Sequence, residues 1–141
     1  MNLQRFVDAQ APVIDVVVAE LEAGAKRTHW MWFIFPQIKT LGRSSTARYY
    51  GLESLEEARA YLADPVLGER LMACTRAVLA HRDKSVAAIF GSPDDLKFRS
   101  CMTLFGLAAP AETLFRQALD QFCEGEPDPL TVAACTGSGD S

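Results

Sequence analysis

Helix-start signals recur along this chain, and each stands before apolar residues spaced three and four apart. Ser54 followed by Glu57 is a capping box, in which each side chain can satisfy a backbone N–H that the first helical turn leaves unpaired. Asp64 precedes Pro65, and this order gives a capping side chain followed by a proline that the first helical turn tolerates. The two signals predict helices that begin near residues 54 and 64.

Further helices are predicted on both sides of these two. Apolar residues at helical spacing run from residue 3 to residue 21, and Gly24 follows as a stop. Because Pro12 removes one backbone donor, we expect a kink there, or a short first helix followed by a second. Ser92 and Pro93 open another helix, and a last long one precedes Gly125.

No two alternating apolar segments joined by a hairpin turn occur in the sequence, so an all-α fold is predicted. We expect a single compact domain of about six to eight short helices over residues 1–135, with residues 136–141 as a flexible C-terminal tail. The alternative is an α+β fold with a minor strand at the WMWFIFP run, residues 30–36, where strand propensity is high. Thr28 could instead cap a two-turn helix there that stops before Pro36.

Composition and charge disfavour several classes of function. A net charge of −4 disfavours a general nucleic-acid binder, which needs a basic face. No apolar run is long enough to span a membrane and the N-terminus has no signal-peptide core, so we expect a cytoplasmic protein. The four cysteines contain no CxxC pair, so we expect free structural thiols, no metal site and no cofactor.

One stretch differs in charge from the rest of the chain. The thirty residues between Glu22 and Glu53 contain no acidic residue, yet they contain five cations and a histidine: Lys26, Arg27, His29, Lys39, Arg43 and Arg48. Such asymmetry creates a local positive potential that can draw an anion against the overall field. Arginine suits such a site because its planar guanidinium grips a phosphate or carboxylate with two hydrogen bonds.

Aromatic residues inside this stretch have two interpretations. Trp30 and Trp32 could stack on a flat ligand ring, or they could simply pack in the core, whose energetics large aromatics dominate. His29 stands just before them and is the candidate catalytic acid or base. No orienting acid lies within a turn of it, and a lone histidine of this kind is more often a capping or structural residue.

Two polar segments complete the predicted site. In GRSS, residues 42–45, glycine, Arg43 and the hydroxyls of Ser44 and Ser45 suit a loop that cradles an anion, or a plain turn with a helix cap. In KFRSCMTLF, residues 97–105, the polar side chains form either a solvated helix face or the opposite wall of the same pocket. The candidate ligand-binding residues are therefore Lys26, Trp30, Trp32, Arg43, Ser44, Ser45, Lys97, Arg99 and Ser100. Cys101 would act as a nucleophile only if its pKa were depressed.

Several long strings resemble a known bacterial family. They are HWMWFIFPQ at 29–37, LGRSSTARYYGL at 41–52, EARAYL at 57–62, DPVLGERL at 64–71 and IFGSPDDLKFRSCMTLF at 89–105. Together they are similar to the domain-of-unknown-function family 1810, some members of which carry the label calpastatin, although nothing in this sequence supports protease inhibition. The resemblance implies a compact, mostly helical domain and no settled activity. The chain departs from the family pattern at Pro12 and Cys101.

These observations favour a helical domain that binds, and could process, a small anionic ligand such as a nucleotide or an ADP-ribose-type metabolite. In the sharpest form of this hypothesis, Arg43 and the hydroxyls beside it face His29 and at least one tryptophan across a single cavity. The alternative function is a protein-interaction module that docks a partner through an exposed aromatic run at residues 30–35. Burial of the tryptophans distinguishes the two hypotheses.

Overall fold

The computed structural model describes residues 2–136 and confirms the all-α fold. Its elements in chain order are α1 (Gln4–Gln10), α2 (Ile14–Ala23), α3 (Met31–Ile34), the 3₁₀ turn η1 (Lys39–Leu41), α4 (Ser45–Tyr49), α5 (Leu55–Ala63), α6 (Leu67–Leu79), α7 (Val86–Phe90), α8 (Asp94–Ala108), α9 (Leu114–Phe122) and α10 (Pro129–Thr136). There are more helices than the predicted six to eight, because three are single turns too short for periodicity to show. The predicted tail lies outside the described residues, apart from Thr136.

The predicted helix ends are largely confirmed. The Ser54 hydroxyl accepts a hydrogen bond from the Glu57 amide at 3.1 Å, while the Glu57 carboxylate accepts one from the Glu53 amide at 3.0 Å. Gly24 ends α2 in the left-handed conformation, with φ of 71°. Pro12 lies in the turn between α1 and α2. Of the two predicted alternatives, the structure therefore contains a short first helix followed by a second, and not a single kinked helix.

The WMWFIFP run forms one helical turn, α3, and no strand, so the α+β alternative is wrong. Within residues 2–136 the only β-type pairing is an isolated bridge between Ile38 and Leu52. The predicted two-turn helix with a Thr28 cap is also wrong. The Thr28 hydroxyl instead donates to the Glu20 carboxylate at 2.7 Å.

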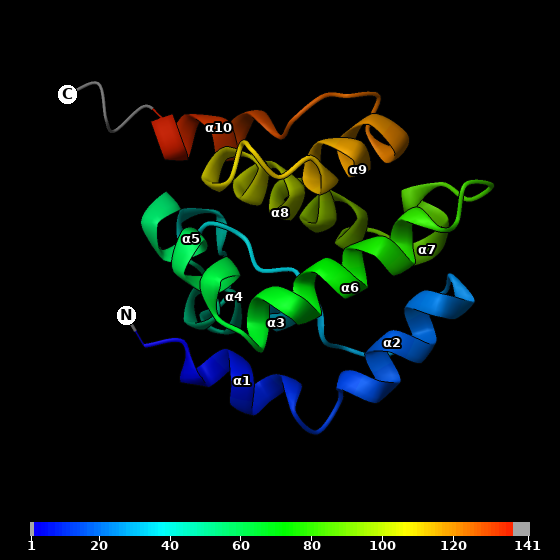
Figure 1. Cartoon of the computed structure of the whole chain (residues 1–141), viewed down its shortest axis with the longest axis horizontal. Coiled ribbons are helices and arrows are strands. Elements are labelled where there is room, and N and C mark those ends of the chain that lie inside the picture. The colour runs from blue at the N-terminus through cyan, green and yellow to red at the C-terminus, as the bar shows by residue number, and fades with distance from the viewer. Residues whose placement is uncertain (1, 137–141) are drawn as a thin grey trace.

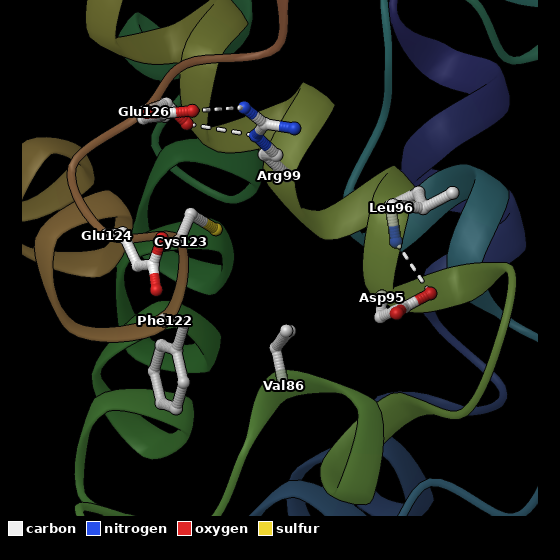
Figure 2. Close-up of a pocket in the computed structure, with 8 residues that line it drawn as sticks. All are labelled: Val86, Asp95, Leu96, Arg99, Phe122, Cys123, Glu124 and Glu126. Atoms are coloured by element: carbon white, nitrogen blue, oxygen red, sulfur yellow. Dashed lines mark hydrogen bonds and ion pairs between the residues drawn. The ribbon is translucent and has the colours of Figure 1, made fainter.

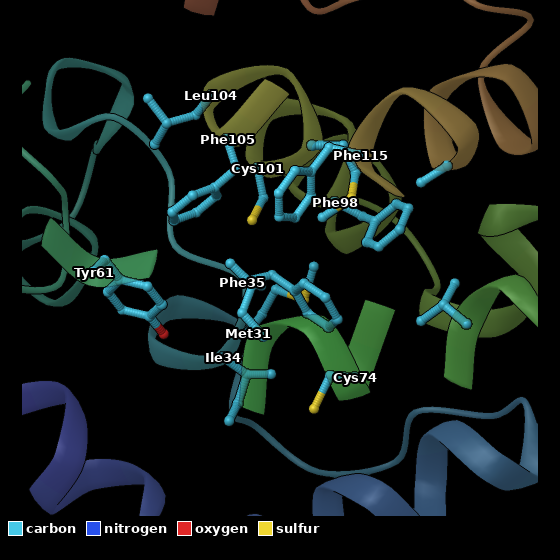
Figure 3. Close-up of a cluster of buried hydrophobic side chains, with 14 of the residues drawn as sticks. Met31, Ile34, Phe35, Tyr61, Cys74, Phe98, Cys101, Leu104, Phe105 and Phe115 are labelled. Carbon is cyan, nitrogen blue, oxygen red and sulfur yellow. The ribbon is translucent and has the colours of Figure 1, made fainter. Parts of the chain in front are cut away.

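Helix α8 packs against four other helices, α5, α7, α9 and α10. Figure 1 shows α6 crossing the middle of the molecule, with α1 and α2 on one side and α8, α9 and α10 on the other. Every residue from Ser100 to Phe105 is buried, as expected for a helix surrounded by others. In Figure 3, side chains that include Phe35, Tyr61 and Phe115 converge on this helix to form the core.

Burial divides the four cysteines, which are all free, into two pairs. Cys74 and Cys101 are buried, whereas Cys123 and Cys135 are partly exposed. Burial raises the pKa of every one of these thiols, that of Cys74 to about 11. We therefore expect a thiol reagent at pH 8 to modify Cys123 and Cys135 first, and the buried pair only on unfolding. Titration of the denatured, unreduced protein should count four thiols, and a count of two would contradict this prediction.

None of the helices in residues 2–136 is long and apolar enough to cross a membrane.

Candidate functional site

A cavity of about 440 Å³ brings two of the predicted segments together. It lies where the chain around η1 meets α8 and the start of α10, and its size falls in the range typical of small-molecule pockets. Its lining residues are Gln37, Thr40, Leu41, Arg43, Leu96, Arg99, Ser100, Asp128 and Leu130. Three of the candidate residues, Arg43, Arg99 and Ser100, therefore share one cavity.

Arg43 is exposed at the edge of this cavity. Its guanidinium makes no hydrogen bond or ion pair with residues 2–136, whereas two other cations of the acid-free stretch, Lys26 and Lys39, pair with Asp94 and Glu53. Distant acids thus neutralise part of the stretch, but not Arg43. Its positive charge is available to a ligand.

The hydroxyls of Ser44 and Ser45, beside Arg43, lie outside the cavity. Ser44 caps α4, because its hydroxyl accepts a hydrogen bond from the Ala47 amide at 3.0 Å. Ser45 is exposed, and neither serine lines the 440 Å³ cavity. In the GRSS loop, Ser44 therefore acts as a helix cap. Of the three side chains, Arg43 is the one that lines the cavity.

Arg99 and Ser100 on α8 form hydrogen bonds with the segment from Glu126 to Asp128, which precedes α10. The Arg99 guanidinium donates to the backbone carbonyls of Glu126 and Pro127, at 2.9 Å each. The Ser100 hydroxyl lies 3.1 Å from the Leu96 carbonyl and 3.2 Å from Asp128 Oδ2. Both side chains hold the cavity wall in place, and they line it at the same time.

Asp128 is a cavity residue that sequence reasoning missed. Its Oδ2 accepts hydrogen bonds from Ser100 and from the amide and hydroxyl of Thr131 at the start of α10. The signal that could have found it is Asp128-Pro129, which repeats the cap-plus-proline pattern of Asp64-Pro65. Gln37 and Thr40 were missed as well, and no local pattern marks them.

Trp30 lies in the core rather than in the cavity. It is 1% exposed, and its indole N–H donates to Glu20 Oε1 at 3.0 Å. The same carboxylate accepts from the Arg27 amide, the Thr28 amide and the Thr28 hydroxyl. Burial by itself would raise the pKa of Glu20, but these four hydrogen bonds outweigh it and lower the pKa to about 2.

Lys26, Lys97 and Trp32 belong to a separate cluster around Asp94. Lys26 Nζ lies 2.9 Å from Asp94 Oδ2 and 5.0 Å from the centre of the Trp30 ring. Lys97 Nζ lies 3.5 Å from Asp94 Oδ1 and 5.3 Å from the centre of the half-buried Trp32 ring. Both lysines are thus engaged within the protein. None of these residues lines the 440 Å³ cavity.

The two side chains considered for catalysis, His29 and Cys101, do not line the 440 Å³ cavity. His29 is exposed, lies outside the cavity of Arg43, and its ring makes no hydrogen bond with the described part of the chain. Cys101 is fully buried, and burial raises the pKa of its thiol well above the ordinary value, which is the opposite of an activated nucleophile. The expected cavity that joins Arg43 to His29 and a tryptophan is therefore replaced by one that joins Arg43 to Asp128.

The profile of the family described as "Protein of unknown function (DUF1810)" matches residues 1–135. The chain belongs to this family. The resemblance noted in the sequence is thereby confirmed.

One solved structure of high similarity is that of the conserved hypothetical protein Rv1873 from Mycobacterium tuberculosis. It is 51% identical in sequence to this DUF1810 chain and superposes on it with a TM-score of 0.94. The match covers 95% of this chain and 96% of the Rv1873 chain. No sequence among the curated proteins matches the chain. The descriptions of the family and of this structure name no activity.

A second cavity, of about 320 Å³, shares Leu96 and Arg99 with the first in its lining. Figure 2 shows Asp95 and Leu96 across from Phe122, Cys123 and Glu124, with Arg99 close to Glu126. Burial raises the pKa of the Cys123 thiol, so this thiol is not activated. Within residues 2–136, no group of three or more His, Cys, Asp or Glu side chains is arranged to hold a metal ion.

Proposed function

We propose that the 440 Å³ cavity of this DUF1810 protein binds a small anionic metabolite, such as a nucleotide or an ADP-ribose-type compound, in the cytoplasm. The observation that carries the proposal is the position of Arg43 at a cavity shared with Arg99 and Ser100, with its guanidinium unpaired in the described structure. An unpaired guanidinium beside a concave surface can grip a phosphate or carboxylate through two hydrogen bonds. The proposal covers binding and includes no catalytic step.

The alternative, docking of a partner through residues 30–35, lacks the exposed surface that it requires. Trp30, Met31, Ile34 and Phe35 are each no more than 2% exposed. Only Trp32 and Phe33 reach the surface, and both are partly covered. Two half-buried rings do not make the contiguous apolar patch that marks a docking site.

A thermal-shift screen with Arg43→Ala tests the proposal. A ligand present at one hundred times its Kd should stabilise the wild type by about 2.7 kcal/mol, which corresponds to a rise in Tm of roughly 10 °C for a domain of this size. Inorganic phosphate, nucleoside monophosphates and ADP-ribose are suitable probes. Arg43→Ala should abolish the stabilisation and leave the unliganded Tm within about 1 °C of the wild type, because the side chain makes no hydrogen bond or ion pair with residues 2–136.

Arg27→Ala is the matched control for this experiment. Arg27 is an exposed cation of the same acid-free stretch and does not line the cavity, so its removal changes the net charge equally and should preserve the ligand response. If Arg43→Ala lowers the unliganded Tm by itself and no anion stabilises the wild type, Arg43 is a structural residue and the proposed function is wrong.

A further inference from the structure

The polar groups that line the cavity of Arg43 fall into two sets. Arg99 and Ser100 are already engaged: the guanidinium of the first holds the carbonyls of Glu126 and Pro127, and the hydroxyl of the second contacts Leu96 and Asp128. These two side chains act mainly as a wall. Their contribution to a ligand is limited to the charge of Arg99 and to the shape that they maintain.

The second set has hydrogen-bonding capacity left over. The side chains of Gln37, Thr40 and Arg43 make no hydrogen bond within residues 2–136, although all three line the cavity. The two carboxylate oxygens of Asp128 differ in this respect. Its Oδ2 accepts three hydrogen bonds, which fix the carboxylate in place, whereas its Oδ1 accepts none from the described residues.

A fixed carboxylate with one free oxygen recognises hydrogen-bond donors on a ligand. The cavity has two guanidinium groups and one carboxylate, and this net positive charge disfavours an ammonium group as the donor. Neutral hydroxyls therefore suit Asp128 Oδ1 and the amide of Gln37 better, and they form strong charge-assisted hydrogen bonds with a carboxylate. The ligand that satisfies both ends of the cavity is anionic at one end and hydroxylated at the other.

We infer that the cavity takes a phosphorylated sugar, alone or as part of a nucleotide, with the phosphate on Arg43 and the sugar hydroxyls on Asp128 and Gln37. Leu41, Leu96 and Leu130 line the same cavity, and Leu96 and Leu130 are 60% and 64% exposed. Such leucines bury the apolar face of a sugar ring or of an attached base. The inference rests on the proposed function, and it adds Asp128 as the residue that selects the ligand.

Isothermal titration with three probes tests the inference: inorganic phosphate, n-butyl phosphate and ribose 5-phosphate. The last two share a phosphate monoester, and only ribose 5-phosphate has sugar hydroxyls. We expect the wild type to bind ribose 5-phosphate at least tenfold more tightly than n-butyl phosphate. Asp128→Asn should reduce that preference to about threefold or less, while the affinity for inorganic phosphate stays equal or rises, because a negative charge has left the cavity.

Gln37→Ala provides a second variant, in case Asp128→Asn loosens α10. The Gln37 side chain makes no hydrogen bond in the described structure, so this substitution removes no hydrogen bond from the fold, and the preference for ribose 5-phosphate should again fall. If the wild type binds n-butyl phosphate and ribose 5-phosphate equally, the sugar inference is wrong and the proposed function stands. If it binds neither of them nor inorganic phosphate, the sugar inference is refuted and the proposed function loses its phosphate ligands. Binding of a free amino acid as tight as that of ribose 5-phosphate would assign Asp128 to an ammonium group and overturn the inference.

Discussion

Glu20→Ala is expected to lower the free energy of unfolding by about 3 kcal/mol at neutral pH. The substitution leaves the Trp30 indole N–H without its acceptor in a core where the ring is 1% exposed, and an unpaired buried donor costs about 1–3 kcal/mol. It also removes the acceptor for the amides of Arg27 and Thr28 and for the Thr28 hydroxyl. Urea denaturation followed by tryptophan fluorescence measures the loss.

Glu22→Ala is the control, because Glu22 lies on the same helix, α2, and is exposed. Its replacement should change stability by no more than about 0.5 kcal/mol. Equal losses for the two variants would show that the carboxylate of Glu20 does not hold the segment from Arg27 to Trp30.

The pKa of Glu20 also predicts how stability depends on pH. The pKa is about 2 in the folded protein and near the ordinary value of 4.5 in the unfolded chain, so the unfolded chain binds the proton first as pH falls. The stabilisation from Glu20 is therefore complete above about pH 5 and is lost between pH 4.5 and pH 2. Glu20→Gln has no such ionisation, so the stability difference between it and the wild type should shrink across that interval.

Sequence reasoning succeeded where the signal was local. The cap at Ser54 and the stop at Gly24 depend on neighbours within a few residues, and the structure contains both. Asp64 accepts hydrogen bonds from the amides of Val66 and Leu67, but α6 begins only at Leu67, with Val66 as its N-cap. The strand propensity of residues 30–36 was overridden by tertiary packing: among residues 2–136 no partner strand lies beside the run, and most of its side chains enter a helical core. The single turns α3, α4 and α7 were too short for a periodic pattern to appear.

The candidate site was predicted only in part, because its geometry depends on segments far apart in the chain. Arg43 was identified from its charge environment, and Arg99 and Ser100 from their chemistry, yet nothing in the sequence shows that residues 37–43, 96–100 and 128–130 meet. The assignment of Trp30 to the site followed from its cationic neighbours. Its actual partner, Glu20, is ten residues away in a helix with other acids, where no pattern distinguishes it.

Gly68→Ala is expected to lower the free energy of unfolding by about 3–4 kcal/mol. A Cβ at Gly68 would overlap the carbonyl oxygen of Leu62 and lie 2.9 Å from the carbonyl carbon. Both are backbone atoms near the end of α5, so no side chain can rotate away. The only relief is to separate α5 from α6, and α5 also packs against α8, which contributes to the wall of the cavity.

Gly106→Ala gives the matched comparison, since Gly106 lies inside α8 and the nearest atom to its added Cβ is the Phe115 Cβ at 3.9 Å, an ordinary contact. Alanine is favoured over glycine in a helix by about 0.5–1 kcal/mol, so this variant should be more stable than the wild type. The two substitutions are chemically identical and both lie in helices, and only their surroundings differ. If thermal unfolding shows a lower Tm for Gly68→Ala and a higher Tm for Gly106→Ala, the difference reports the close approach of α5 to α6. A Gly68→Ala variant as stable as the wild type would show that the two helices have room to move apart.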